Sequence, residues 1–184
     1  MAIDRFGTQG FRGTSVSQLS RDAGLTPAAA YAYFADKDAY WMAAIEADLD
    51  ALEAEIRETA LRSEQPIYDL MAGLLGALDR HALTRRVFAE GTPDDLRLVL
   101  HHRIFSGTTA LIADRLAARK AAGLLPGDGD PEVLARGIET VMFGLIVSTV
   151  RAGMVGDVDR FWSVVEVLRA AVGGAPTASE IEGV

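Results

Sequence analysis

The chain has 184 residues, of which 49% are hydrophobic, and a formal net charge of −8. This length is enough to bury a sizeable core in one large or two small domains, while the acidic charge argues against a protein that coats nucleic acid non-specifically, because affinity for the phosphate backbone depends on Lys and Arg. There is no cysteine, no signal-peptide h-region and no uninterrupted apolar run of about 18 residues, so we expect a cytoplasmic protein without disulfides or a membrane span.

The amino-terminal segment predicts a short helix with Ile3 and Phe6 on its apolar face, followed by a region that contains Gly7 and Gly10. Residues 1–37 hold four basic side chains against three acidic ones, so the acidic excess lies in the rest of the chain. The start of the chain is therefore the part best suited by charge to meet DNA.

The next stretch, residues 14–40, predicts two short helices joined by a tight turn. Thr14 and Ser15 are candidate caps for the first helix, and Gly24 ends it, since glycine readily adopts the left-handed conformation found just past a helix. The apolar positions of this helix recur at the three-and-four spacing of one buried face. They are Val16, Leu19 and Ala23.

The second helix of this pair begins directly after the turn. Thr26 is a hydroxyl cap, and Pro27 occupies the first helical position, where a missing N–H has no cost. The helix is expected to run to about Phe34, and a third start follows at Asp36. This pattern predicts a helix-turn-helix, whose second helix enters the major groove of DNA.

The same segment resembles the DNA-binding domain of the TetR family of transcriptional regulators. The resemblance rests on a Tyr-x-x-Phe pair at the end of the second helix, formed by Tyr31 and Phe34, and on Lys37 at the start of the next helix. Further agreeing positions are Phe6, Gly10, Phe11, Thr14, Ser15, Val16, Leu19, Ala23, Gly24, Leu25, Thr26, Asp36 and Ala39.

The resemblance implies roles for individual residues. Phosphate contacts are expected from Thr14 or Ser15, Thr26, Tyr31 and Lys37, and base contacts from Pro27 and Ala28. The family often has a Lys or Arg at position 27, a Thr at 29 and a His at 33, where this chain has Pro27, Ala29 and Tyr33. The recognition helix therefore carries few polar side chains that can read bases.

The remainder of the chain predicts further helices and no strand, so we expect an all-α fold of about nine helices. A long amphipathic helix is expected from Asp36 to about Ser63, and in the resembled family this helix transmits ligand binding to the DNA-reading pair. The later predicted helices begin at Pro66, Leu83, Leu96, Val133 and Asp157 and end near His81, Glu90, Ala122, Met154 and Val172. Residues 175–184 are expected to form a frayed tail.

The last two predicted helices are the expected dimer interface. The helix from Val133 is apolar on nearly every side and is expected to be buried all round, and the pair is too apolar for the surface of one protomer. The interface residues expected on the final helix are Val158, Phe161, Trp162, Val165 and Leu168.

An apolar and aromatic set in the second half of the chain is the candidate ligand-binding cavity. Its members are Met71, Leu75, Phe88, Phe105, Met142, Phe143 and Ile146. Plain core packing explains each of these residues about equally well, and the resemblance to proteins with small, often hydrophobic, inducers favours a cavity. The three histidines, His81, His101 and His102, lack metal-ligand spacing, although one of them is a candidate for lining the cavity.

The sequence thus predicts a homodimeric, ligand-responsive regulator that binds a double-stranded DNA operator, with no catalytic residues, cofactor or metal site. Residues 1–38 are assigned to DNA binding and residues 39–174 to ligand binding and dimerisation. We expect a repressor released by a small hydrophobic molecule. The alternative is a dimeric ligand-binding protein whose degenerate helix-turn-helix binds DNA weakly or not at all. An enzyme is the least favoured interpretation, because no nucleophile elbow, phosphate loop or dinucleotide motif occurs.

Overall fold

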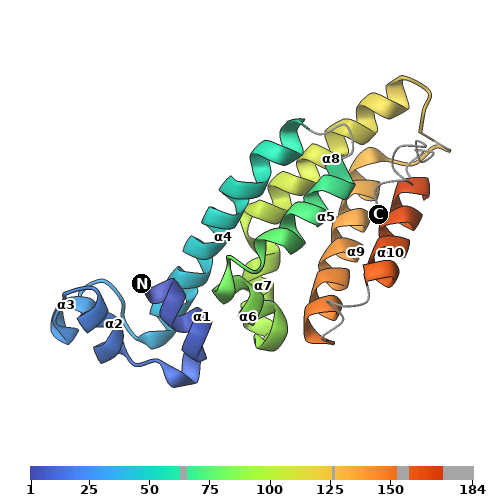
Figure 1. The fold of residues 1–184 in the computed structure, drawn as a ribbon. Coiled ribbons are helices and arrows are strands. Elements are labelled where there is room, and N and C mark those ends of the chain that lie inside the picture. Colours follow the sequence, from blue (N-terminus) through green and yellow to red (C-terminus); the bar gives the residue numbers. More distant parts are fainter. Residues whose placement is uncertain (63–65, 126, 153–157, 172–184) are drawn as a thin grey trace.

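The computed structural model describes residues 1–62, 66–125, 127–152 and 158–171, which form ten helices and no strand (Figure 1). The all-α prediction is confirmed. The helices are α1 (Ala2–Gly13), α2 (Val16–Asp22), α3 (Pro27–Tyr31), α4 (Lys37–Arg62), α5 (Pro66–Ala77), α6 (Ala82–Glu90), α7 (Pro93–His101), α8 (Arg103–Ala121), α9 (Pro131–Arg151) and α10 (Val158–Ala171). The expected tail at 175–184 lies outside the described residues.

The helix starts follow from local capping chemistry. The Ser15 hydroxyl accepts a hydrogen bond from the Gln18 amide, and the Gln18 side chain accepts one from the Ser15 amide, which completes a capping box at α2. The Thr26 hydroxyl accepts from the Ala29 amide at 3.2 Å, with Pro27 as the first residue of α3. Gly24 has a φ of 68° in the turn between them. The predicted helix-turn-helix is therefore present.

A break at His102 accounts for the helix that the sequence count missed. The segment expected as one helix from Leu96 to Ala122 is two helices, α7 and α8, because His102 has extended backbone angles (φ −67°, ψ 148°). The Nδ1 atom of His102 accepts a hydrogen bond from the Ile104 amide at 3.2 Å and so caps α8. Histidine is not a usual helix breaker, and the apolar periodicity continues through it, so the pattern gave no sign of the break.

Helix α4 connects the amino-terminal helices to the rest of the molecule, and α8 and α9 pack side by side along the second half (Figure 1). One face of α4 is fully buried through Ile45, Leu49 and Leu52. The same core contains Phe88 of α6, Ile112 of α8 and Ile146 of α9. A continuous core therefore lies under α4 and extends into the carboxy-terminal helices.

Helix α1 is held against α6 by close backbone packing. A Cβ atom built at Gly7 would lie 3.0 Å from the Ala82 Cβ and 3.0 Å from the Leu83 amide nitrogen, so only glycine fits there without movement of the backbone. The Arg86 guanidinium donates to the Gly7 carbonyl at 2.9 Å and to the Thr8 carbonyl at 3.1 Å. Gly10 interrupts α1 with φ 72° and ψ 175°, a conformation that favours glycine.

Helix α9 is not buried all round within a single chain, and its predicted burial by a partner protomer stays a prediction. It packs against α8 and α6, but Val133 is 58% and Val141 43% exposed. Its most apolar window has a mean hydropathy of 1.6, so by length and composition α9 is able to span a membrane. The expectation of no membrane span counted only uninterrupted apolar runs and missed this helix. One such helix among the described residues is a weak indication, because core helices of proteins without membrane spans pass the same test.

Candidate functional sites

The start of α2 and most of α3 form an exposed surface that includes the N-termini of both helices, and Ala30 of α3 is buried beneath it. Ser15, Thr26, Pro27 and Ala28 are exposed, and Tyr31 at the end of α3 is 54% exposed. Helix N-termini carry unpaired N–H groups and the positive end of the helix dipole, which suit them to phosphate. The structure therefore brings five of the seven residues predicted to contact DNA to the protein surface.

Thr14 does not belong to this exposed group. It is 2% exposed, and its hydroxyl donates a 2.9 Å hydrogen bond to the Gly10 carbonyl. The kink at Gly10 turns this carbonyl out of the helical ladder, and Thr14 satisfies it. Thr14 and Ser15 were predicted as alternatives for one phosphate contact, and only Ser15 is on the surface.

Lys37 begins α4 and is held by an aromatic ring. Its Nζ lies 4.2 Å from the centroid of the Phe11 ring, and the residue is half-buried. A lysine over a ring face is attracted by the ring quadrupole. The α1 residue Phe11 thus positions the charge predicted to contact a phosphate, a relationship that the sequence pattern did not reveal.

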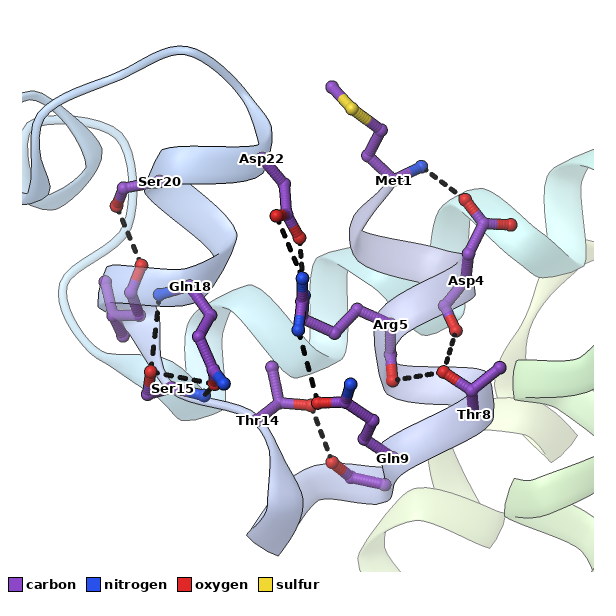
Figure 2. A network of polar contacts seen from close by, with 12 residues as sticks. Met1, Asp4, Arg5, Thr8, Gln9, Thr14, Ser15, Gln18, Ser20 and Asp22 are labelled. Carbon is purple, nitrogen blue, oxygen red and sulfur yellow. Dashed lines mark hydrogen bonds and ion pairs between the residues drawn. The ribbon is translucent and has the colours of Figure 1, made fainter.

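An arginine on α1 fixes the orientation of α2. Figure 2 shows Arg5 reaching from α1 to Asp22 on α2. Its Nη2 donates to Asp22 Oδ1 at 2.9 Å, and its Nε contacts Asp22 Oδ2. The hydrogen bond from Arg5 lowers the pKa of Asp22 below its ordinary value of 3.8. Sequence reasoning missed this pair, because the two residues are 17 positions apart on different helices.

A small apolar cavity lies where the sequence predicted a ligand site. Its volume is about 30 Å³, and three predicted residues, Phe105, Met142 and Ile146, contribute to its wall. The other residues that line it are Ile56, Leu74, Ile104, Thr108 and Glu139. Cavities that hold drug-sized ligands measure about 300–1,000 Å³, and a water needs about 10–15 Å³ of space measured in this way. In this structure the cavity has room for a water molecule or two but is too small for a drug-sized ligand.

The remaining predicted cavity residues are placed differently. The Phe143 ring makes edge contacts with Phe105 and Phe88, at centroid distances of 5.4 and 6.1 Å, so a row of three rings runs from the cavity to α6. Leu75 is half-buried against the core. The side chain of Met71 lies outside the described residues.

The predicted dimer residues on α10 do not share one exposed face. Val165 is 1% exposed within a single chain, so its side chain is not available to a partner. Trp162 and Leu168 are partly buried against the core, and the side chains of Val158 and Phe161 lie outside the described residues. Among the described side chains of α10, the large apolar one that is exposed is Val167, at 67%.

His81 and His102 have structural partners, and none of the three histidines lines the apolar cavity. The Nδ1 of buried His81 lies 2.9 Å from Asp48 Oδ1, and its Nε2 lies 3.3 Å from Glu55 Oε2. His102 caps α8 and contacts Asp50, and His101 is exposed. Within the described segments, no group of three or more His, Asp or Glu side chains is arranged to hold a metal ion.

Residues 2–39 match the family model of the bacterial regulatory proteins of the tetR family. This part of the chain is a TetR-family DNA-binding domain. The match covers the whole of α1, α2 and α3 and ends just inside α4. No curated protein matches the sequence.

Solved structures of other proteins share the fold over nearly the whole chain. A TetR-family regulator from Pectobacterium atrosepticum aligns with a TM-score of 0.69 and 18% identity, covering 96% of this chain and 92% of the other. FadR from Bacillus subtilis in complex with stearoyl-CoA aligns at 0.65 and 16% identity, with coverages of 93% and 95%. SmeT, the repressor of a Stenotrophomonas maltophilia multidrug efflux pump, aligns at 0.64 and 19% identity, with coverages of 93% and 86%.

Proposed function

We propose that this protein is a cytoplasmic, homodimeric DNA-binding transcriptional regulator of the TetR family that responds to a small molecule, and that it acts as a repressor. The observation that carries the proposal is the exposed surface formed by the N-termini of α2 and α3, with Lys37 beside it. Residues 1–38 would bind DNA, and residues 39–174 would bind the effector and form the dimer. Two recognition helices related by a two-fold axis would read the half-sites of an operator.

The effector proposed for the second domain is apolar, because the walls of the cavity are built almost entirely from aliphatic and aromatic side chains. Binding requires the cavity to expand, and expansion would push on the ring row Phe105–Phe143–Phe88. Phe88 belongs to α6, whose Arg86 holds the carbonyls of Gly7 and Thr8 in α1. By this route an effector that binds the expanded state better would shift the population away from the DNA-binding conformation.

Support for an effector also comes from neighbours of the same fold. FadR from Bacillus subtilis was solved with stearoyl-CoA, and AibR was solved with isovaleryl-CoA and operator DNA (TM-score 0.52, 14% identity). These ligands belong to those proteins, and the effector proposed for this chain follows from its own cavity.

The second candidate is a dimeric ligand-binding protein with a degenerate helix-turn-helix. One observation favours it: α3 reads Pro-Ala-Ala-Ala-Tyr and has a single polar side chain, Tyr31. Electrophoretic mobility shift with the DNA that flanks the protein's own gene separates the two. A shift by the unmutated protein that weakens in Lys37→Ala supports the regulator. Absence of any shift at low salt, with apolar compounds still raising the melting temperature, supports the second candidate.

A further inference from the structure

A second, larger cavity lies between the DNA-binding helices and the rest of the molecule. Its volume is about 410 Å³, and it is bounded by the end of α1, the first turn of α4, the end of α6 and the start of α7. This volume falls in the range of about 300–1,000 Å³ that small-molecule sites occupy. Unlike the apolar cavity, it has room for a guest without expansion.

Three of the charged side chains that line this cavity, Arg86, Glu90 and Asp95, already have partners. Arg86 donates to the carbonyls of Gly7 and Thr8 and pairs with Glu90. Asp95 is 8% exposed and accepts hydrogen bonds from Trp41 Nε1 and from the Thr92 amide and hydroxyl. These groups shape the cavity, but their main hydrogen-bonding capacity is used within the protein.

Two other charged side chains of the cavity have no partner among the described residues. Arg12 at the end of α1 and Asp38 in the first turn of α4 are both exposed. Neither forms a side-chain hydrogen bond or an ion pair with a described residue, and they do not pair with each other. One free guanidinium and one free carboxylate therefore border the same cavity, with the Trp41 and Phe11 side chains in its wall.

We propose that this cavity, between α1 and the α6–α7 connection, binds a small zwitterion of amino-acid size. The guest carboxylate would bind the Arg12 guanidinium, which presents paired N–H donors to a carboxylate, and the guest ammonium would bind Asp38. Its side chain would pack on Trp41 and Phe11. A guest with both charges compensates both free groups, whereas a guest with one charge leaves the other uncompensated. The site is distinct from the apolar cavity and does not rest on the proposed effector function.

Isothermal titration calorimetry on the full chain, without DNA, tests this site. The probes are the free amino acids, titrated one at a time, and then the N-acetyl and carboxamide derivatives of the best binder, each of which lacks one charge. We expect millimolar or tighter binding of at least one free amino acid and a loss of about tenfold or more with either derivative, because a charge-assisted hydrogen bond is lost.

Matched variants locate the binding. Arg12→Gln and Asp38→Asn should each weaken binding by about tenfold. Arg85→Gln and Asp94→Asn, which change exposed side chains outside the cavity, should leave it unchanged. Far-ultraviolet circular dichroism confirms that each variant is folded. The proposal is overturned if no free amino acid binds, if a derivative with one charge binds as tightly as the parent, or if binding survives both cavity substitutions.

Discussion

The indole Nε1 of Trp41 donates a 2.6 Å hydrogen bond to Oδ1 of Asp95, although the two residues are 54 positions apart in the sequence. Both side chains are buried. The other carboxylate oxygen, Oδ2, accepts from the Thr92 amide and hydroxyl at 2.8 Å each. One carboxylate therefore caps α7 and ties it to the first turn of α4, the helix that leads to the DNA-binding pair.

Asp95→Ala should lower the free energy of unfolding by about 2–4 kcal/mol, because it removes a helix cap and leaves the Trp41 N–H buried without an acceptor. Urea denaturation at a fixed protein concentration measures this change. Asp94→Ala is the control, because the Asp94 side chain is exposed and pairs with Arg97. This substitution should change the free energy of unfolding by less than about 1 kcal/mol. Equal effects of the two substitutions would contradict the role of the Trp41 contact.

Lys37→Ala should weaken binding to all DNA sequences about equally and reduce the log–log salt slope by roughly one unit, because one phosphate contact is lost. Fluorescence anisotropy at several salt concentrations measures the slope. Lys120 is the matched control, since it is the only other lysine in the chain and bonds the Gly129 carbonyl far from α3. A Lys37→Ala loss confined to one operator sequence would instead assign base readout to this residue.

Phe105→Ala should enlarge the apolar cavity and destabilise the fold by about 3–5 kcal/mol. The enlarged space should accept benzene or a similar apolar probe, which raises the melting temperature of the variant by mass action. Leu124→Ala, which removes a side chain that is 60% exposed, should do neither. If Phe105→Ala is destabilised but gains no affinity for the probe, the space has collapsed and the cavity is not a binding site.

Acid should weaken the link between α1 and α2. The pKa of Asp22 is lowered in the folded protein by the hydrogen bond from Arg5, so this pair stabilises the fold above pH 3.8, the ordinary pKa of the carboxyl. The contribution is lost as the pH falls through the lowered pKa of the folded state.

The stability difference between the unmutated protein and Asp22→Asn should therefore shrink below about pH 4. Urea denaturation over a pH series measures it. Other carboxylates with lowered pKa values, such as Asp50 and Glu55, are present in both proteins and cancel in the difference. A difference that stays constant with pH would show that ionisation of Asp22 does not contribute.

The exposed apolar residues of α9 and α10 are the expected places to disrupt a dimer. Val141→Glu and Val167→Glu should shift the protein toward monomer, because each places a charge in a surface that must be desolvated. Sedimentation velocity at micromolar concentration measures the shift. Leu124→Glu changes an exposed apolar residue outside both helices and should leave the dimer intact. An unmutated protein that sediments as a monomer would remove the proposed dimer.

The parts of the fold that depend on neighbouring residues were predictable. Thr26, Pro27 and Gly24 mark helix ends through their own hydrogen bonds and backbone preferences, so the helix-turn-helix could be assigned before any tertiary contact was known. Asp130 and Pro131 mark the start of α9 by the same local chemistry, with the Asp130 carboxylate accepting from the Glu132 and Val133 amides.

The parts that depend on distant partners were not predictable. Periodicity placed Val165 on an apolar stripe, but it does not tell whether the same chain or a partner covers that stripe. Thr14 faces inward because the kink at Gly10 frees a carbonyl. Arg151 donates to the carbonyls of Phe88 and Gly91 at 3.0 and 2.8 Å. Hydrogen bonds to main-chain carbonyls some 60 residues away are not predicted by the spacing of apolar and polar side chains.

The attachment of α1 to α6 determines when the DNA-binding segment is able to mature during synthesis. Arg86 and the Gly7 carbonyl that it binds are 79 positions apart, so residues 1–39 leave the ribosome well before the surface that supports their first helix. At about 5–20 residues per second, synthesis of the 79 positions from Gly7 to Arg86 takes roughly 4–16 seconds. A fragment that ends near residue 40 would expose Phe6, which in the complete protein is fully buried and packs against Trp41.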